Sequence, residues 1–158
     1  MNDYTAKKLG EVMAFVRVGG EQIKKSKTAL LEAMDEVEVE RILHMYEEHE
    51  RQMSDLADAS LKSEIIKTKA LATADKIRAM SNLYMKEESD WEDPSEVIEW
   101  LGFFEGGAIV HFKLAQAAAE TLGLLEVSTF TTAGVNAHSG LLEDLKIAIK
   151  RVVKNKAE

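Results

Sequence analysis

Apolar residues recur along most of this chain at steps of three and four positions, which is the spacing of one face of an α-helix. Five segments show this spacing, at about residues 2–34, 35–56, 63–85, 94–122 and 128–155. No segment alternates with period two for long enough to predict a strand. The stretch EVSTFTT, which begins at Glu126, favours a strand locally, but its neighbours on both sides are helical. We expect it to form the first turns of the last helix, so the pattern predicts an all-α fold.

Capping residues mark several of the expected helix ends. Asp35 is followed by Glu38 three residues later in a capping-box pattern, and Asp93 precedes Pro94 at a first helical position. Gly123 is a typical C-terminal stop. The expected helices have about 23 to 32 residues, or about 35–48 Å at 1.5 Å per residue. Long helices joined by short links pack as an antiparallel bundle.

The two halves of the chain share several features in the same order. They are the segments EVMAFV and EVIEWL, the pairs Gly19-Gly20 and Gly106-Gly107, and the residues His49 and His138. Chance and internal duplication both account for this match, and we favour duplication. In that interpretation the helix at residues 63–85 is a crossover between two helix pairs.

Composition is that of a single compact domain spanning residues 1–158. Hydrophobic residues make up 46% of the chain, which has one proline and nine glycines. The absence of cysteine excludes disulfides and thiolate metal sites, and it suits a reducing compartment. The N-terminus lacks the apolar core of a signal peptide, and no apolar run approaches the roughly 18–20 residues of a spanning helix. We therefore expect a cytoplasmic protein without membrane contact.

Charge and motifs narrow the classes of function further. Acidic residues outnumber basic ones by 28 to 20, giving a formal net charge of −8. This balance argues against nucleic-acid binding, which uses a basic face to neutralise phosphates. The chain has no Gly-x-Ser-x-Gly, phosphate loop, His-Glu-x-x-His or dinucleotide fingerprint. A hydrolase or transferase therefore has little support, and the sequence does not decide whether the protein is an enzyme.

Two stretches carry a resemblance to known proteins. They read HMYEEHERQMSDL, from His44, and FFEGGAIVHFKLAQAAAETLG, from Phe103, and they cover about a fifth of the chain. They resemble the ferritin-like superfamily, and more narrowly the bacterial stress-induced ferritin-like proteins of the YciE/YciF type. The resemblance implies a ferritin-like antiparallel bundle of two helix pairs joined by a crossover helix. It also implies descent from a protein with a di-iron carboxylate site.

The ligand set for such a site is incomplete in this chain. A di-iron site takes one Glu from each of two helices and a Glu-x-x-His from each of the other two. Here Tyr46 stands in the place of the glutamate before His49, and Val135 in the place of the glutamate before His138. Of the two single glutamates only Glu105 falls near an apolar helix face. The resemblance therefore implies a degenerate or remodelled metal site.

The remaining candidate ligands are three histidines on apolar stripes, His49, His111 and His138, with Glu105 or Glu48. Neutral imidazole is a good ligand for transition metals. We expect a single transition-metal ion (iron, zinc or manganese), with a role in stress or redox handling. The competing interpretation makes each histidine a core residue satisfied by one hydrogen bond. We expect Tyr46, on the same stripe as His49, to hydrogen-bond His49 or a carboxylate.

A second class of function needs no metal. In it the chain is a non-catalytic bundle that forms a homodimer or binds a partner through an exposed apolar surface. The candidate residues for that surface are Trp91, Val97, Trp100, Leu101 and Phe104. The glycine pairs are likewise open to two explanations, because helical glycines permit close packing but also leave space for a ligand.

Overall fold

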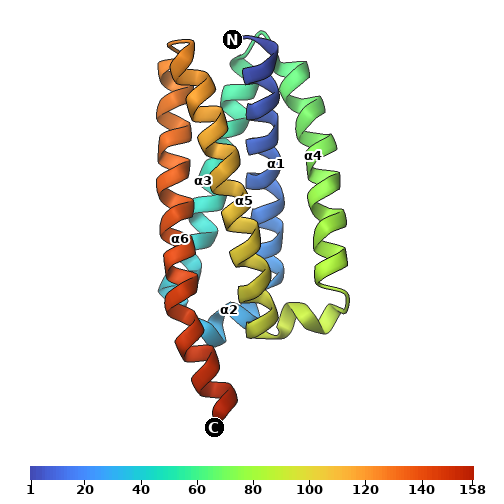
Figure 1. Cartoon of the computed structure of the whole chain (residues 1–158), viewed down its shortest axis with the longest axis vertical. Coiled ribbons are helices and arrows are strands. Elements are labelled where there is room, and N and C mark those ends of the chain that lie inside the picture. The colour runs from blue at the N-terminus through green and yellow to red at the C-terminus, as the bar shows by residue number, and fades with distance from the viewer.

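Six α-helices and one short 3-10 helix make up the fold, and the computed structural model describes all 158 residues (Figure 1). The helices are α1 (Asp3–Lys25), α2 (Lys27–Ala33), α3 (Glu36–Ala59), α4 (Ser63–Tyr84), α5 (Pro94–Thr121) and α6 (Leu125–Ala157), with the 3-10 helix at Glu88–Glu92. The prediction of an all-α protein is confirmed. No helix has the length and apolar character needed to cross a membrane.

The first predicted helix is two helices in the structure. The chain leaves the α1 helix at Ser26, whose hydroxyl donates to the carbonyl of Gln22 at 2.8 Å. A serine that bonds back to its own helix competes with the backbone ladder and favours a break. The short α2 then lies across the end of the bundle (Figure 1). The expectation of one continuous helix to residue 34 is therefore wrong.

The helix α3 begins directly after Asp35 as expected, but the Asp35 side chain makes no cap hydrogen bond and pairs with Arg151 instead, so the predicted capping box is not formed. The capping signals at Asp93 and Gly123 are confirmed. The Asp93 side chain accepts a hydrogen bond from the backbone N–H of Ser95, and Pro94 is the first residue of α5. Gly123 has a positive φ of 65°, which favours glycine, and it separates α5 from α6. The EVSTFTT stretch is helical, as predicted, and α6 begins at Leu125, slightly before the expected start.

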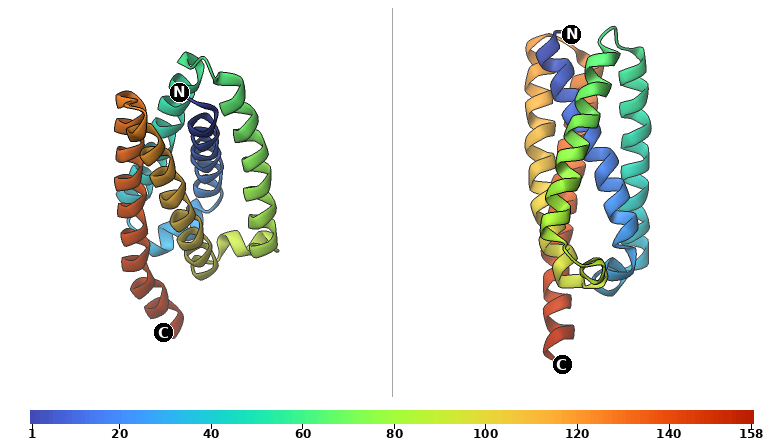
Figure 2. Two further views of the ribbon diagram at one scale, coloured as in Figure 1. Left: turned by 45° about the horizontal axis from the view of Figure 1, so that its top comes forward. Right: turned by 90° about the vertical axis from the view of Figure 1, so that its right-hand side faces the viewer.

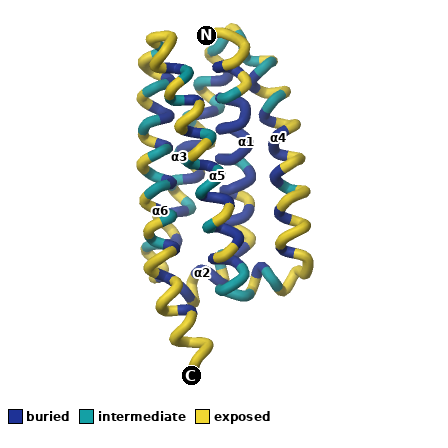
Figure 3. Tube along the Cα trace, in the orientation of Figure 1, coloured by how far each residue is buried: buried dark blue, intermediate teal, exposed yellow.

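Successive long helices run in opposite directions, and α1 lies near the centre (Figures 1 and 2). The α1 helix packs against α3, α4 and α5, while α5 and α6 lie side by side. The contact between α1 and α4 is close, since a Cβ added at Gly10 would lie 2.5 Å from the carbonyl oxygen of Ile66. Figure 3 shows the consequence, because α1 is buried along most of its length.

The apolar surface suggested for partner binding lies inside the bundle. Trp91, Val97, Trp100, Leu101 and Phe104 are all buried. The indole N–H of Trp100 donates to the side-chain oxygen of Gln22 at 2.8 Å, and so joins α5 to α1. These residues form the core face of α5 and the segment before it. The prediction that they form an exposed docking surface is therefore wrong.

Candidate functional site

Four polar side chains are buried together in the interior of the bundle. Tyr46 and His49 come from α3, Glu105 from α5 and His138 from α6. Their exposed fractions are 1% for Tyr46, 7% for His49, and 0% for Glu105 and His138. Buried polar groups destabilise a fold unless they are hydrogen-bonded or hold a ligand. The contacts of these four residues therefore decide what the site can do.

Glu105 connects two of the other residues. The Tyr46 hydroxyl donates to one oxygen of the Glu105 carboxylate, which meets the expectation that Tyr46 bonds a carboxylate. The other oxygen lies 2.5 Å from Nδ1 of His138. A carboxylate accepts hydrogen bonds, so Nδ1 of His138 carries the hydrogen. In a neutral ring the Nε2 atom of His138 then holds the free lone pair.

Two imidazole nitrogens in this group have no hydrogen-bond partner. They are Nε2 of His138 and Nδ1 of His49, and both atoms are buried. The two rings are neighbours, with their centroids 5.7 Å apart. An unsatisfied buried nitrogen is unfavourable, and two on adjacent rings need a common explanation. A bound ion would satisfy both, because a neutral imidazole nitrogen is a metal ligand.

Burial affects the protonation states of His49 and Tyr46. Burial, with a smaller contribution from nearby His138, lowers the pKa of His49 from 6.5 to about 4. His49 is therefore neutral at pH 7. Burial and the negative charge of Glu105 raise the pKa of Tyr46 well above its usual 10. Tyr46 therefore stays protonated and remains a donor to Glu105.

Glycines and phenylalanines shape the walls of the site. A Cβ added at Gly19 on α1 would lie 2.3 Å from Cε1 of Tyr46, so only glycine leaves room for that ring. On α6, a Cβ at Gly134 would lie 2.0 Å from Cε1 of Phe112, whose ring centroid is 5.0 Å from that of His138. The close-packing explanation therefore holds for Gly19. It does not extend to Gly106, where an added Cβ would meet nothing within 4 Å.

The other two candidate ligands lie away from this group. His111 is half-buried, and its Nδ1 is 3.0 Å from Glu11, which also pairs with Lys8 and Lys69. Adjacent helical residues point about 100° apart, so Glu48 cannot share the direction of His49. Glu48 lies at the surface and pairs with Arg51 at 2.6 Å. The six-residue step from Glu105 to His111 likewise turns His111 about 240° around α5.

Phe130 is a neighbour of the site that the sequence pattern did not indicate. Its ring centroid lies 5.9 Å from that of His49 and 5.9 Å from that of Phe112. The signal was present, because Phe130, Gly134 and His138 follow one another at steps of four.

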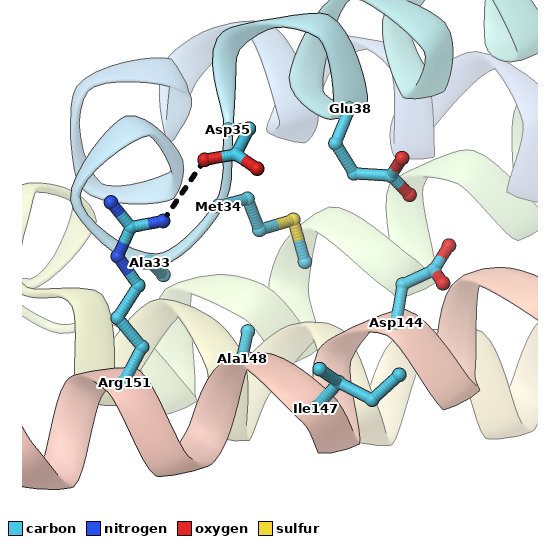
Figure 4. Close-up of a pocket in the computed structure, with 8 residues that line it drawn as sticks. All are labelled: Ala33, Met34, Asp35, Glu38, Asp144, Ile147, Ala148 and Arg151. Carbon is cyan, nitrogen blue, oxygen red and sulfur yellow. Dashed lines mark hydrogen bonds and ion pairs between the residues drawn. The ribbon is translucent and has the colours of Figure 1, made fainter.

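A separate hollow of about 280 Å³ lies where α2 and α3 meet α6 (Figure 4). Glu38 and Asp144 face one another across it, and both pair with Arg41. Burial, then the hydrogen bond with Glu38, raises the pKa of Asp144. Arg151 pairs with Asp35 at 3.2 Å at the other end. The charged groups of this hollow satisfy one another, and none of the candidate ligands lies in it.

No family model, no curated protein and no solved structure matches this chain. The chemistry of the site therefore has to be judged from its residues. A di-iron carboxylate site does not fit them, since such a site takes four carboxylates and Glu105 is the one carboxylate of the buried group. The structure shows no group of three or more His, Asp or Glu side chains arranged to hold an ion. The two unpartnered imidazole nitrogens are the donors that the site offers.

Proposed function

We propose that this chain is a ferritin-like bundle with a remodelled site that binds one transition-metal ion between His49 and His138. The observation that carries the proposal is the pair of buried, unpartnered nitrogens on two adjacent rings. The ion would supply the partner that both nitrogens lack. Handling of this ion in stress or redox chemistry is the function that follows.

Each residue of the buried group has a distinct part in this proposal. Nε2 of His138 and Nδ1 of His49 are the ligands. Glu105 accepts from Nδ1 of His138, and metal-binding histidines commonly donate their second ring N–H to a carboxylate in this way. Tyr46 in turn fixes Glu105. Imidazole ligands favour zinc or iron over manganese, which prefers oxygen. An ion held by two nitrogens keeps open positions for water or a substrate, which Lewis-acid or redox chemistry requires.

The arrangement of helices supports the ferritin-like part of the proposal. The α4 helix runs along the bundle from the end of α3 to the segment before α5 (Figure 1). A single long crossover between two antiparallel pairs is typical of ferritin-like bundles. The two matching histidines of the halves, His49 and His138, also meet in space. This pairing is what duplication of a metal-binding helix pair would produce.

Metal titration by isothermal calorimetry tests the proposal. With Zn²⁺, and with Fe²⁺ under anaerobic conditions, we expect about one ion per chain. The variants His49→Gln and His138→Gln should lose this binding, and Glu105→Gln should weaken it by about 10- to 100-fold. His111→Gln is the matched control, because His111 lies outside the buried group. Equal binding by the parent and both ligand variants would refute the assignment, provided that circular dichroism shows them folded.

A homodimer without metal is the second candidate, and the outer face of α5 favours it. Phe103 and Val110 are 68% and 56% exposed, and Leu114 continues the same face. Gly102 and Gly106 beside them have no atom within 4 Å of an added Cβ, which leaves room for a helix of a second copy. Analytical ultracentrifugation should show a dimer that Phe103→Asp converts to a monomer. A monomer at high concentration would exclude this candidate.

A further inference from the structure

A groove of about 580 Å³ lies between the later turns of α3 and the first turns of α6. Gln52, Asp55 and Leu56 line it from α3, and Glu126, Thr129 and Phe130 line it from α6. Its position matters because His49 lies one helical turn before Gln52 on α3. The groove therefore opens over the part of α3 that carries a proposed metal ligand.

One aromatic ring separates the groove from His49. Phe130 lines the groove and also packs edge-on against His49, with an angle of 76° between the ring planes. Phe130 and His49 are each only 7% exposed, so both lie just beneath the surface. A rotation of the Phe130 side chain would connect the groove with the His49 ring.

The rim of the groove is acidic. Asp55 and Glu126 are both exposed there, and Asp55 shares Arg51 with Glu48. Glu126 lies in the first turn of α6. Carboxylates at the mouth of a cleft raise the local concentration of cations and speed their association. The charge of the rim therefore suits a positively charged ligand.

A second hollow that reaches the buried group offers no ligand nitrogen to a cation. It is a hollow of about 80 Å³ between α1 and α3, and Tyr46 forms part of its wall. The Tyr46 hydroxyl is already bonded to Glu105. The charged residues of the hollow pair with one another, Arg17 with Glu50 and Lys24 with Glu47. No histidine lines it. A cation using this path would meet the protonated phenol of Tyr46 before any ligand nitrogen.

We infer that the groove between α3 and α6 is the entrance through which a divalent cation reaches His49, with Phe130 as its gate. This inference rests on the proposed metal site. The rim carboxylates collect the hydrated ion, movement of Phe130 admits it, and His49 and then His138 replace water molecules in its coordination shell. The gate residue is a positioning residue for access and is not itself a ligand.

Stopped-flow measurement of Co²⁺ binding, followed by the visible absorption of the bound ion, tests the inference. Phe130→Ala should raise the association and dissociation rate constants together, each by about tenfold, and leave Kd nearly unchanged. Phe130→Leu keeps more of the buried volume and should show the same trend, so a folding defect in the alanine variant does not remove the test.

The double variant Asp55→Asn, Glu126→Gln tests the charge of the rim. It should bind Co²⁺ more slowly than the parent, and its association rate should depend less on ionic strength. Glu50→Gln, at the smaller hollow, is the matched control and should bind at the parent rate.

The outcomes separate the two proposals. Binding at the parent rate in all groove variants would overturn the groove as entrance and leave the metal site standing. Slower binding in Glu50→Gln with unchanged rates in the groove variants would place the entrance at the smaller hollow. No Co²⁺ binding by the parent chain would overturn the metal site and the entrance with it.

Discussion

The burial of His49 sets the pH dependence expected at the scale of single residues. Its pKa is about 4 in the folded chain, against 6.5 for an exposed histidine. Below pH 6.5 the unfolded chain binds a proton at this position that the folded chain does not bind. The free energy of unfolding should therefore fall as the pH drops from about 6.5 to 4, by up to about 3 kcal/mol from this residue. Above pH 6.5 neither the folded nor the unfolded chain binds this proton, so the contribution of His49 to the free energy of unfolding is at its full value and no longer changes with pH.

Urea unfolding at several pH values, compared between the parent and His49→Gln, isolates this effect. Other groups titrate in the same range, so the difference between the two curves is the quantity to follow. The parent should lose more stability on acidification than His49→Gln does. His44→Gln removes an exposed histidine and should keep the slope of the parent. Parallel curves for the parent and His49→Gln would show that burial does not suppress protonation of this ring.

The sequence predicts some residues of the buried site correctly. The directions of the side chains around their helices explain why the other candidate ligands lie elsewhere. The apolar stripes that carry His49, His138 and Glu105 predict that all three lie in the interior, and all three are buried. Glu48 is next to His49 in the chain but points away from it and pairs with Arg51. His111 is only half-buried and pairs with Glu11. The angle around a helix can be read from one chain, but the axial register between helices cannot. That the Glu105 carboxylate bonds Tyr46 and His138 at once depends on that register.

At the scale of helices, the contact between α1 and α3 depends on Gly19. A methyl group there would lie 2.3 Å from the Tyr46 ring and must displace it or separate the helices. We expect Gly19→Ala to lower the free energy of unfolding by about 1–3 kcal/mol. Gly106→Ala is the matched control, since nothing lies within 4 Å of the added group. It should be neutral or raise stability by up to about 1 kcal/mol, because alanine favours the helix. Urea unfolding at pH 7 measures both, and equal effects would contradict the packing argument.

Helix positions could be predicted from the spacing of apolar residues, and the exceptions have local causes. The break at Ser26 arises from one hydroxyl that bonds back to Gln22, and a spacing pattern does not report such a bond. In α5 the helix itself is predicted correctly, but its apolar residues lie on more than one face. Trp100 and Leu101 face the core, while Phe103 is exposed. A helix that is apolar on much of its circumference does not reveal from sequence which face will be covered.

At the scale of the whole molecule, two halves of one chain bring matching positions together. His49 and His138 match in sequence order, and their rings are neighbours in space. The glycine pairs of the two halves match in sequence but differ in what packs against them. Gly19 accommodates Tyr46, whereas Gly106 lies against open space. The interior is therefore not symmetric. It holds one carboxylate, one phenol and two imidazoles, whereas a di-iron site has four carboxylates and two imidazoles.

X-ray absorption spectroscopy of the chain loaded with one equivalent of Zn²⁺ tests the central claim most directly. The account predicts two imidazole nitrogens in the first coordination shell, at about 2.0–2.1 Å, together with light oxygen ligands. The imidazole contribution should be absent in His49→Gln and His138→Gln, which are expected to lose the ion, and it should be unchanged in His111→Gln. A shell of oxygen ligands alone in the parent, with no imidazole scattering, would contradict a metal site at His49 and His138.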